Sequence, residues 1–158
     1  MPNVMRWRYG ETNPVVAAVA AETAIEIGDL LVLDAGYAKP ASDVDVGGEV
    51  PVSQEAVHDK FLGVAMQASP AGEASEIRVA SSGVFEFDQT SASVTLGARI
   101  AVAGGTGNTT LAAQHVVAVA DNAPQLAIGR CAKQTASAPT ILVAIKSTVM
   151  NDGPQAVA

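Results

Sequence analysis

The sequence has little of what catalytic, metal-binding and disulfide-stabilised proteins rely on. Its 158 residues include one cysteine and two histidines. A single cysteine cannot form an internal disulfide, and the chain has no Cys pair, no His-x-x-x-His motif and no complete acidic calcium loop. We therefore expect no metal and no cofactor. Cys131, which lies in an apolar run, is interpreted as a small buried hydrophobe.

The remaining catalytic signals are also weak. His58 stands beside Asp59 and His115 precedes an apolar run, but no Gly-x-Ser-x-Gly elbow supports a Ser-His-Asp triad. Residues 104–110 lack the Gly-Lys step of a phosphate-binding loop and are interpreted as a turn. Asp residues at 43 and 45 lie in a polar loop and are interpreted as solvated. We predict that the protein is not an enzyme.

Basic residues are few as well. The chain has nine Lys and Arg residues and sixteen Asp and Glu residues, which gives a formal net charge of −7. A nucleic-acid surface needs clustered basic residues, so we expect no direct nucleic-acid partner. The N-terminus lacks the apolar core of a signal peptide, and residues 15–24 are too short and too polar to span a bilayer. We expect a protein made in the cytoplasm without membrane contact.

What the chain does contain is small and β-branched apolar residues. It is 49% hydrophobic but only 4% aromatic, and β-branched residues favour strands. Short apolar blocks alternate with Gly, Pro, Ser and Asp, a pattern that predicts strands joined by turns. Residues 39–51 predict a long polar loop. Residues 53–60 predict one short helix, with Ser53 as its N-cap.

An imperfect internal repeat is the strongest feature of the sequence. Three blocks of the first half recur in the same order in the second, and aligning Gly63 with Gly129 places Ala65 on Cys131. The first copy has residues 25–33, 61–67 and 76–80, and the second has residues 94–102, 126–134 and 140–144. The repeat predicts an all-β fold, a small β-barrel or sandwich made of two pseudo-repeated halves, with at most one short helix.

The same pattern predicts the domain organisation. A single β domain covers residues 15–150 and contains the two halves, about residues 25–88 and 94–149. Residues 151–158 are expected to form a flexible tail.

The N-terminal segment stands outside the repeat. We interpret residues 1–14 as a docking arm, because residues 5–9 hold two arginines, the only tryptophan and one of two tyrosines. Trp, Tyr and Arg dominate interface hot spots. The alternative is that Trp7 plugs one end of the barrel. The predicted partner-binding residues are Met5, Arg6, Trp7, Arg8 and Tyr9.

The ordered motifs resemble the tailed-phage capsid cement (decoration) protein family. The resemblance covers residues 25–149 and rests on Ile27-Gly28-Asp29-Leu30-Leu31-Val32, Phe61-Leu62-Gly63-Val64-Ala65, residues 72–79 and Gly83-Val84-Phe85. It implies a non-enzymatic virion protein that binds the outer capsid surface and stabilises the shell. The implied partners are the major capsid protein and further copies of the chain, with a trimer favoured.

The sequence departs from the family pattern in two places. Residues 39–51 and the helix after them are longer than the usual connection. Ala98 stands in the second copy where the first has Asp29.

Two other functions remain open from the residues alone. A small β-barrel carrier or accessory subunit of an enzyme would need a modified lysine at a hairpin tip, and Lys39 is the only candidate. A glycan-binding surface module would use exposed aromatic residues, of which the whole chain has six, namely three Phe, two Tyr and one Trp.

Overall fold

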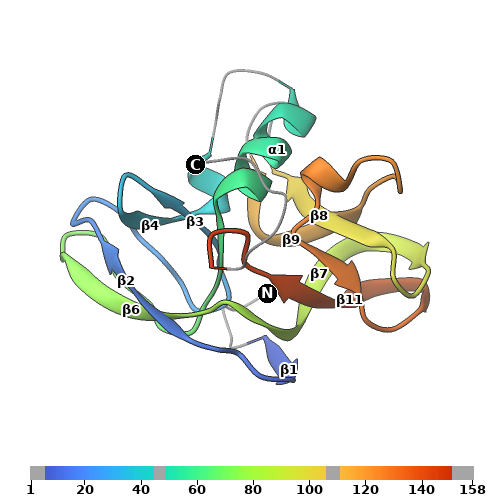
Figure 1. Ribbon diagram of the computed structural model, residues 1–158, viewed down its shortest axis with the longest axis horizontal. Helices are drawn as coiled ribbons and strands as arrows, with labels where there is room; N and C mark the ends of the chain where they lie inside the picture. The colour runs from blue at the N-terminus through green and yellow to red at the C-terminus, as the bar shows by residue number, and fades with distance from the viewer. Residues whose placement is uncertain (1–5, 45–48, 106–110, 151–158) are drawn as a thin grey trace.

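The protein is built from two β-barrels that lie side by side, with one α-helix over their junction (Figure 1). The computed structural model describes residues 6–44, 49–105 and 111–150. Each barrel closes from five strands. The predicted all-β fold of two related halves with one short helix is confirmed, and each half closes a barrel of its own. No helix within the described ranges is long and apolar enough to cross a membrane.

The two barrels use consecutive parts of the chain. The first consists of β2 (Val15–Val19), β3 (Leu30–Asp34), β4 (Tyr37–Pro40), β5 (Phe61–Ala65) and β6 (Ser75–Ala80). The second consists of β7 (Ser82–Val94), β8 (Arg99–Gly104), β9 (Leu111–Ala118), β10 (Gly129–Cys131) and β11 (Thr135–Lys146). Outside the barrels lie β1 (Trp7–Tyr9), α1 (Val50–Lys60) and the short 3₁₀ helices η1 (Ala41–Asp43) and η2 (Pro124–Leu126).

The internal repeat corresponds to the same strand pairings in each barrel. β2 pairs parallel with β4 and antiparallel with β6, and β7 pairs in the same two senses with β9 and β11. The antiparallel pairs β3–β4, β3–β5 and β5–β6 have their counterparts in β8–β9, β8–β10 and β10–β11. Residues 83–88, placed at the end of the first half from sequence, begin β7 and pair within the second barrel.

Backbone contacts also recur at the positions that the sequence aligns. The glycine before the second strand of each barrel donates its N–H to the residue that ends the fourth strand. Gly28 binds the Ala65 carbonyl at 2.9 Å, and Gly97 binds the Cys131 carbonyl at 2.9 Å. Gly28 and Gly97 both have positive φ, +94° and +85°, which glycine adopts without steric cost. The repeat therefore marks equivalent turns as well as equivalent strands.

The continuous apolar runs of the first half lie where a strand is covered on both faces. Leu31 packs inside the first barrel with Ala17 and Val19. Leu30 and Val32, its neighbours along β3, join the cluster that fills the second barrel and the junction. Strands buried on both faces have apolar residues at consecutive positions, whereas strands with one solvent face alternate. Strand β3 therefore lies between two apolar clusters, one inside the first barrel and one that fills the second barrel and the junction.

Helix α1 is longer than the sequence predicts. It begins at Val50, not Ser53, and its N-cap residue Glu49 makes no side-chain cap hydrogen bond. The prediction of Ser53 as N-cap is wrong because Pro51 already occupies the first turn, where its missing N–H is tolerated. Ser53 instead lies within the helix and is buried. The Gln54 Nε2 donates to the Val102 carbonyl at 2.8 Å, so the helix is bound to β8.

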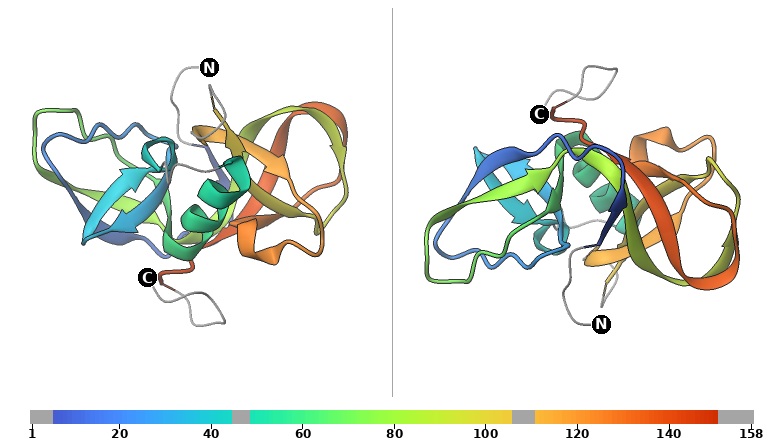
Figure 2. Two further views of the ribbon diagram at one scale, coloured as in Figure 1. Left: turned by 90° about the horizontal axis from the view of Figure 1, so that it is seen from above. Right: turned by 90° about the horizontal axis from the view of Figure 1, so that it is seen from below.

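Both ends of the described chain cross the junction between the barrels (Figure 2). The N-terminal segment runs along the β6–β7 connection, where the Ser81 N–H donates to the Thr12 carbonyl at 2.9 Å. After β11, the Ser147 N–H donates to the Ser81 carbonyl at 2.9 Å, and the Thr148 N–H to the Phe61 carbonyl at 3.1 Å. These contacts join the two barrels into one unit and fix where the N-terminal segment lies.

Candidate docking surface

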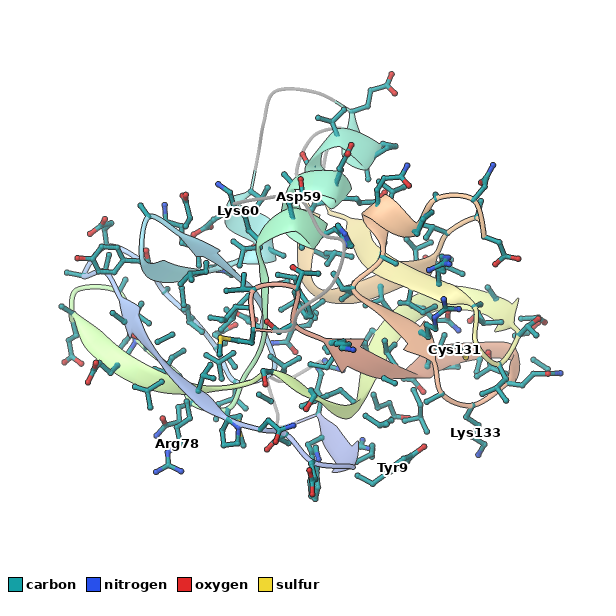
Figure 3. All side chains as sticks on the ribbon, in the orientation of Figure 1. Tyr9, Asp59, Lys60, Arg78, Cys131 and Lys133 are labelled. Carbon is teal, nitrogen blue, oxygen red and sulfur yellow. The ribbon has the colours of Figure 1, made fainter. Side chains whose placement is uncertain are left out.

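The N-terminal segment forms a short strand on the face of the molecule opposite helix α1. Figure 3 places Tyr9 at the lower edge of the view, and Asp59 and Lys60 of the helix toward the upper edge. Trp7 and Tyr9 are 43% and 51% exposed. Strand β1 belongs to neither closed barrel, and the exposure of Trp7 contradicts the alternative that its side chain fills a barrel end.

Strand β1 is an edge strand with an irregular register. It pairs antiparallel with β7, with Trp7 opposite Phe85 and Tyr9 opposite Val84, and the register shifts between the two pairs. A shift of this kind twists an edge and re-aims its side chains, which also discourages further strand addition. The Trp7 Nε1 donates to the Gly10 carbonyl at 2.9 Å, so the indole is held against its own strand end.

Arg8 lies on the surface and forms an ion pair with Glu86 of β7. The second carboxylate oxygen of Glu86 accepts a hydrogen bond from Thr140 Oγ1 of β11 at 3.1 Å. The hydrogen bond from Arg8 is the main cause that lowers the pKa of Glu86, with Thr140 adding to it and burial opposing it. The pair thus links β1 to the outer face of the second barrel.

We expect Glu86→Gln to loosen β1 locally and to lower the free energy of unfolding by less than about 1 kcal/mol, as for other exposed ion pairs. Because the folded pKa of Glu86 lies below its ordinary value of 4.5, its contribution is complete above that value and is lost as the pH falls through the folded pKa. Fluorescence of Trp7, the only tryptophan, checks this in an acid titration. Part of the fluorescence change that the wild type shows on acidification should be missing in Glu86→Gln. Identical titration curves for the two proteins would contradict the role of the Arg8–Glu86 pair.

Arg6 has the opposite environment and points into the protein. It is 3% exposed, and its Nη2 lies 3.2 Å from Asp88 Oδ2. Its Nη1 donates to the Glu86 carbonyl at 3.2 Å and its Nε to Gln114 Oε1 at 2.7 Å. The guanidinium carbon lies 5.9 Å from the centre of the Phe87 ring, within cation–π range. Arg6 therefore anchors β1 and does not offer its charge to a partner.

A polar pocket of about 240 Å³ lies around the Arg6 side chain. Asp29 in its wall has a raised pKa because burial penalises the ionised carboxylate, and hydrogen bonds from the Glu26 N–H and Gln114 partly oppose this. The lining residues are Arg6, Glu26, Asp29, Asp88, Ala113, Gln114 and His115. Among the described residues, no group of three or more His, Cys, Asp or Glu side chains is arranged to hold a metal ion.

The structure brings only part of the predicted site to the surface. Trp7, Arg8 and Tyr9 lie together on β1 and are exposed, Arg6 is buried beside them, and Met5 lies outside the described residues. The residues that seat Arg6 were not found from the sequence, since Asp88 and Gln114 are 82 and 108 positions away from it. No local pattern marks such partners.

Other residues considered from the sequence have structural surroundings. Cys131 is buried, as predicted. The His58 Nδ1 lies 2.6 Å from the Ala127 carbonyl. Lys39 lies within β4 and not at a hairpin tip, and its Nζ is 3.0 Å from Asp34 Oδ2. The hydrogen bond from Lys39 is the main cause that lowers the pKa of Asp34. Lys39 therefore lacks the exposed tip position that a carrier lysine needs.

Comparison with known proteins gives little beyond a general likeness. No protein-family model matches the chain, and no curated protein matches it. Among solved structures, the N base of the head fiber protein gp8.5 in bacteriophage phi29 is similar, with 12% sequence identity and a TM-score of 0.46. The alignment covers 84% of this chain and 94% of that one. A likeness of this size does not bear on function.

Proposed function

We propose that the protein is a non-enzymatic structural protein that binds the outer surface of a phage capsid and stabilises the shell. The observation that carries the proposal is the distribution of the six aromatic residues. All three phenylalanines are fully buried, whereas the tryptophan and both tyrosines are 43% to 51% exposed. Two of these three exposed rings, Trp7 and Tyr9, lie on strand β1. Large exposed aromatic side chains in a chain so poor in them support a binding surface.

The rigidity of β1 supports a docking role over a flexible tether. A segment that orders only on binding loses conformational freedom at that moment and binds more weakly per unit of interface area. Strand β1 is already paired with β7, and Arg6 is already seated in the protein. Trp7 and Tyr9 are therefore preorganised for contact before a partner arrives.

The partner in this proposal is the major capsid protein. The ordered motifs resemble those of capsid cement proteins. In the structure, residues 27–32, 61–65 and 72–79 belong to the first barrel and residues 83–85 to β7 of the second. A shell offers many identical sites, so a homo-oligomer, with a trimer favoured, would gain avidity from several weak contacts. The acidic net charge of −7 keeps the protein soluble before assembly.

Binding to capsids tests the proposal directly. The purified protein is mixed with expanded and with unexpanded shells of the phage that carries the gene, and the shells are sedimented. We expect the protein to sediment with expanded shells in a saturable amount and to raise the temperature at which they open. Failure to bind any expanded capsid would refute the proposal. Binding that leaves the opening temperature unchanged would refute the stabilising role.

A further inference from the structure

Asp29 of the first half and Ala98 of the second make the same backbone hydrogen bonds but have different side chains. Asp29 in the first half and Ala98 in the second both accept a backbone hydrogen bond, from Ala65 at 2.9 Å and from Cys131 at 2.8 Å. The amides of Asp29 and Ala98 also close equivalent turns at 3.1 Å. An alanine therefore suffices for this backbone in the second barrel. The Asp29 carboxylate must serve something that the second half lacks.

The side chain of Asp29 leads to the N-terminal strand through one intermediate residue. Its Oδ1 accepts a hydrogen bond from Gln114 Nε2 at 2.9 Å, and its Oδ2 accepts one from the Glu26 N–H at 3.0 Å. Gln114 Oε1 in turn accepts from Arg6 Nε at 2.7 Å. Asp29 precedes β3 of the first barrel and Gln114 lies on β9 of the second. The series thus connects both barrels to the segment that begins β1.

The chemistry of the three side chains allows one arrangement only. An arginine guanidinium can only donate hydrogen bonds and an ionised carboxylate can only accept them. The Gln114 amide must therefore turn its oxygen to Arg6 and its nitrogen to Asp29. Asp88 balances the buried Arg6 charge by an ion pair of 3.2 Å. Removing the Gln114 amide leaves the Nε of the buried Arg6 without this acceptor, and an unmet hydrogen bond at a buried group costs more than the bond contributed.

We propose that Asp29, Gln114 and Asp88 are positioning residues of the docking surface, acting through Arg6. They hold β1 in the orientation that presents Trp7 and Tyr9, and none of them touches the partner. The difference between Asp29 and Ala98 follows, because the Asp29 carboxylate binds the Gln114 amide that holds Arg6, and an alanine could not. The seating of β1 is a property of the isolated protein, whereas its consequence for docking rests on the proposed function.

The seating can be tested without a capsid by comparing two glutamines of the second barrel. Gln114→Ala removes the link to Arg6. Gln89→Ala is the control, because Gln89 lies on β7 of the same barrel and its Nε2 donates to the Ala138 carbonyl at 2.8 Å. We expect Gln114→Ala to speed amide exchange of residues 7–9 and of the Glu86 N–H, which binds the Arg6 carbonyl, by about tenfold or more. Gln89→Ala should leave exchange in β1 unchanged.

Asp29→Ala is a second variant that is expected to fold, because Ala98 supports the same backbone contacts in the second barrel. It should speed exchange in β1 by a smaller factor than Gln114→Ala, because Gln114 Nε2 still donates to the Ile27 carbonyl at 3.1 Å. It should also hasten tryptic cleavage after Arg8. Equal exchange in β1 for the wild type, Gln114→Ala and Asp29→Ala would overturn the inference. Faster exchange in both variants, with β1 of Gln89→Ala unchanged, would support it.

Capsid binding then separates the inference from the proposed function. We expect Gln114→Ala to bind expanded shells about tenfold more weakly than Gln89→Ala. If the exchange rates differ but the two variants bind equally well, the positioning role in docking is wrong. If the wild type itself does not bind, the proposed function fails, while the exchange experiment still decides whether these residues seat β1.

Discussion

Replacing Gly63 with alanine should destabilise the protein by about 4 kcal/mol or more, a size reserved for severe steric or packing faults. A Cβ at this position would lie 1.9 Å from the Ala80 carbonyl oxygen and 2.8 Å from its carbon. Both atoms belong to the backbone of β6, the strand paired with β5, and cannot rotate away. Gly63 also has φ +152°, which an L side chain rarely adopts. The barrel must open between these strands to admit one methyl group.

The control is a glycine with a positive φ but open space around it. Gly36, in the turn between β3 and β4, has φ +87° and no atom within 4 Å of an added Cβ. Gly36→Ala should therefore cost only about 1 kcal/mol of backbone strain. Urea unfolding followed by circular dichroism measures both variants. Equal stabilities for Gly63→Ala and Gly36→Ala would show that β5 and β6 do not approach as the structure has them.

The same contact shows why the sequence repeat was informative. Gly129, aligned with Gly63 from sequence, has its own close approach, with an added Cβ 2.4 Å from the Ala144 carbonyl oxygen. Ala80 and Ala144 are themselves aligned in the repeat. Glycines at close backbone contacts and apolar runs at buried strands leave local marks in a sequence. For this reason the strand blocks and their order could be predicted.

No local sequence pattern indicated that the two halves close into two separate barrels. Each barrel closes where a parallel pair joins its first and third strands, and each pair has a single matched position, Ala18 with Tyr37 and Asp88 with His115. These contacts depend on how the strands twist and meet in space, not on a pattern along the chain. The sequence therefore predicted two halves without predicting that each half encloses its own core.

The docking segment was predictable in composition but not in geometry. Arginine is common both at interfaces and in buried ion pairs, so the residue type alone could not assign Arg6. Its role depends on Asp88 and Gln114, which the fold brings to it from distant parts of the chain. Trp7 and Tyr9, which make no comparable buried contacts, keep the predicted role as candidates for partner binding.

Substituting Trp7 or Tyr9 by alanine should weaken capsid binding by about 30-fold each, the loss expected for a hot-spot side chain worth about 2 kcal/mol. Both residues lie on the surface, about half exposed, so the free energy of unfolding should change by less than about 1 kcal/mol. Tyr37→Ala is the matched control. Tyr37 is 44% exposed, like the other two, but begins β4 of the first barrel. Sedimentation with expanded shells over a range of protein concentrations gives the three affinities.

Single substitutions are a better test than removal of residues 1–10 of whether Trp7 and Tyr9 bind the capsid. Such a deletion would take away Arg6 together with the two aromatic rings and would leave Asp88 without the guanidinium that balances it. Any loss of binding could then come from a disturbed second barrel. Trp7→Ala and Tyr9→Ala leave the contacts of Arg6 intact. A loss of capsid binding confined to these two variants therefore assigns docking to β1. If Tyr37→Ala weakens binding as much as Trp7→Ala does, the contact surface includes the β3–β4 hairpin, and β1 alone is not the docking site.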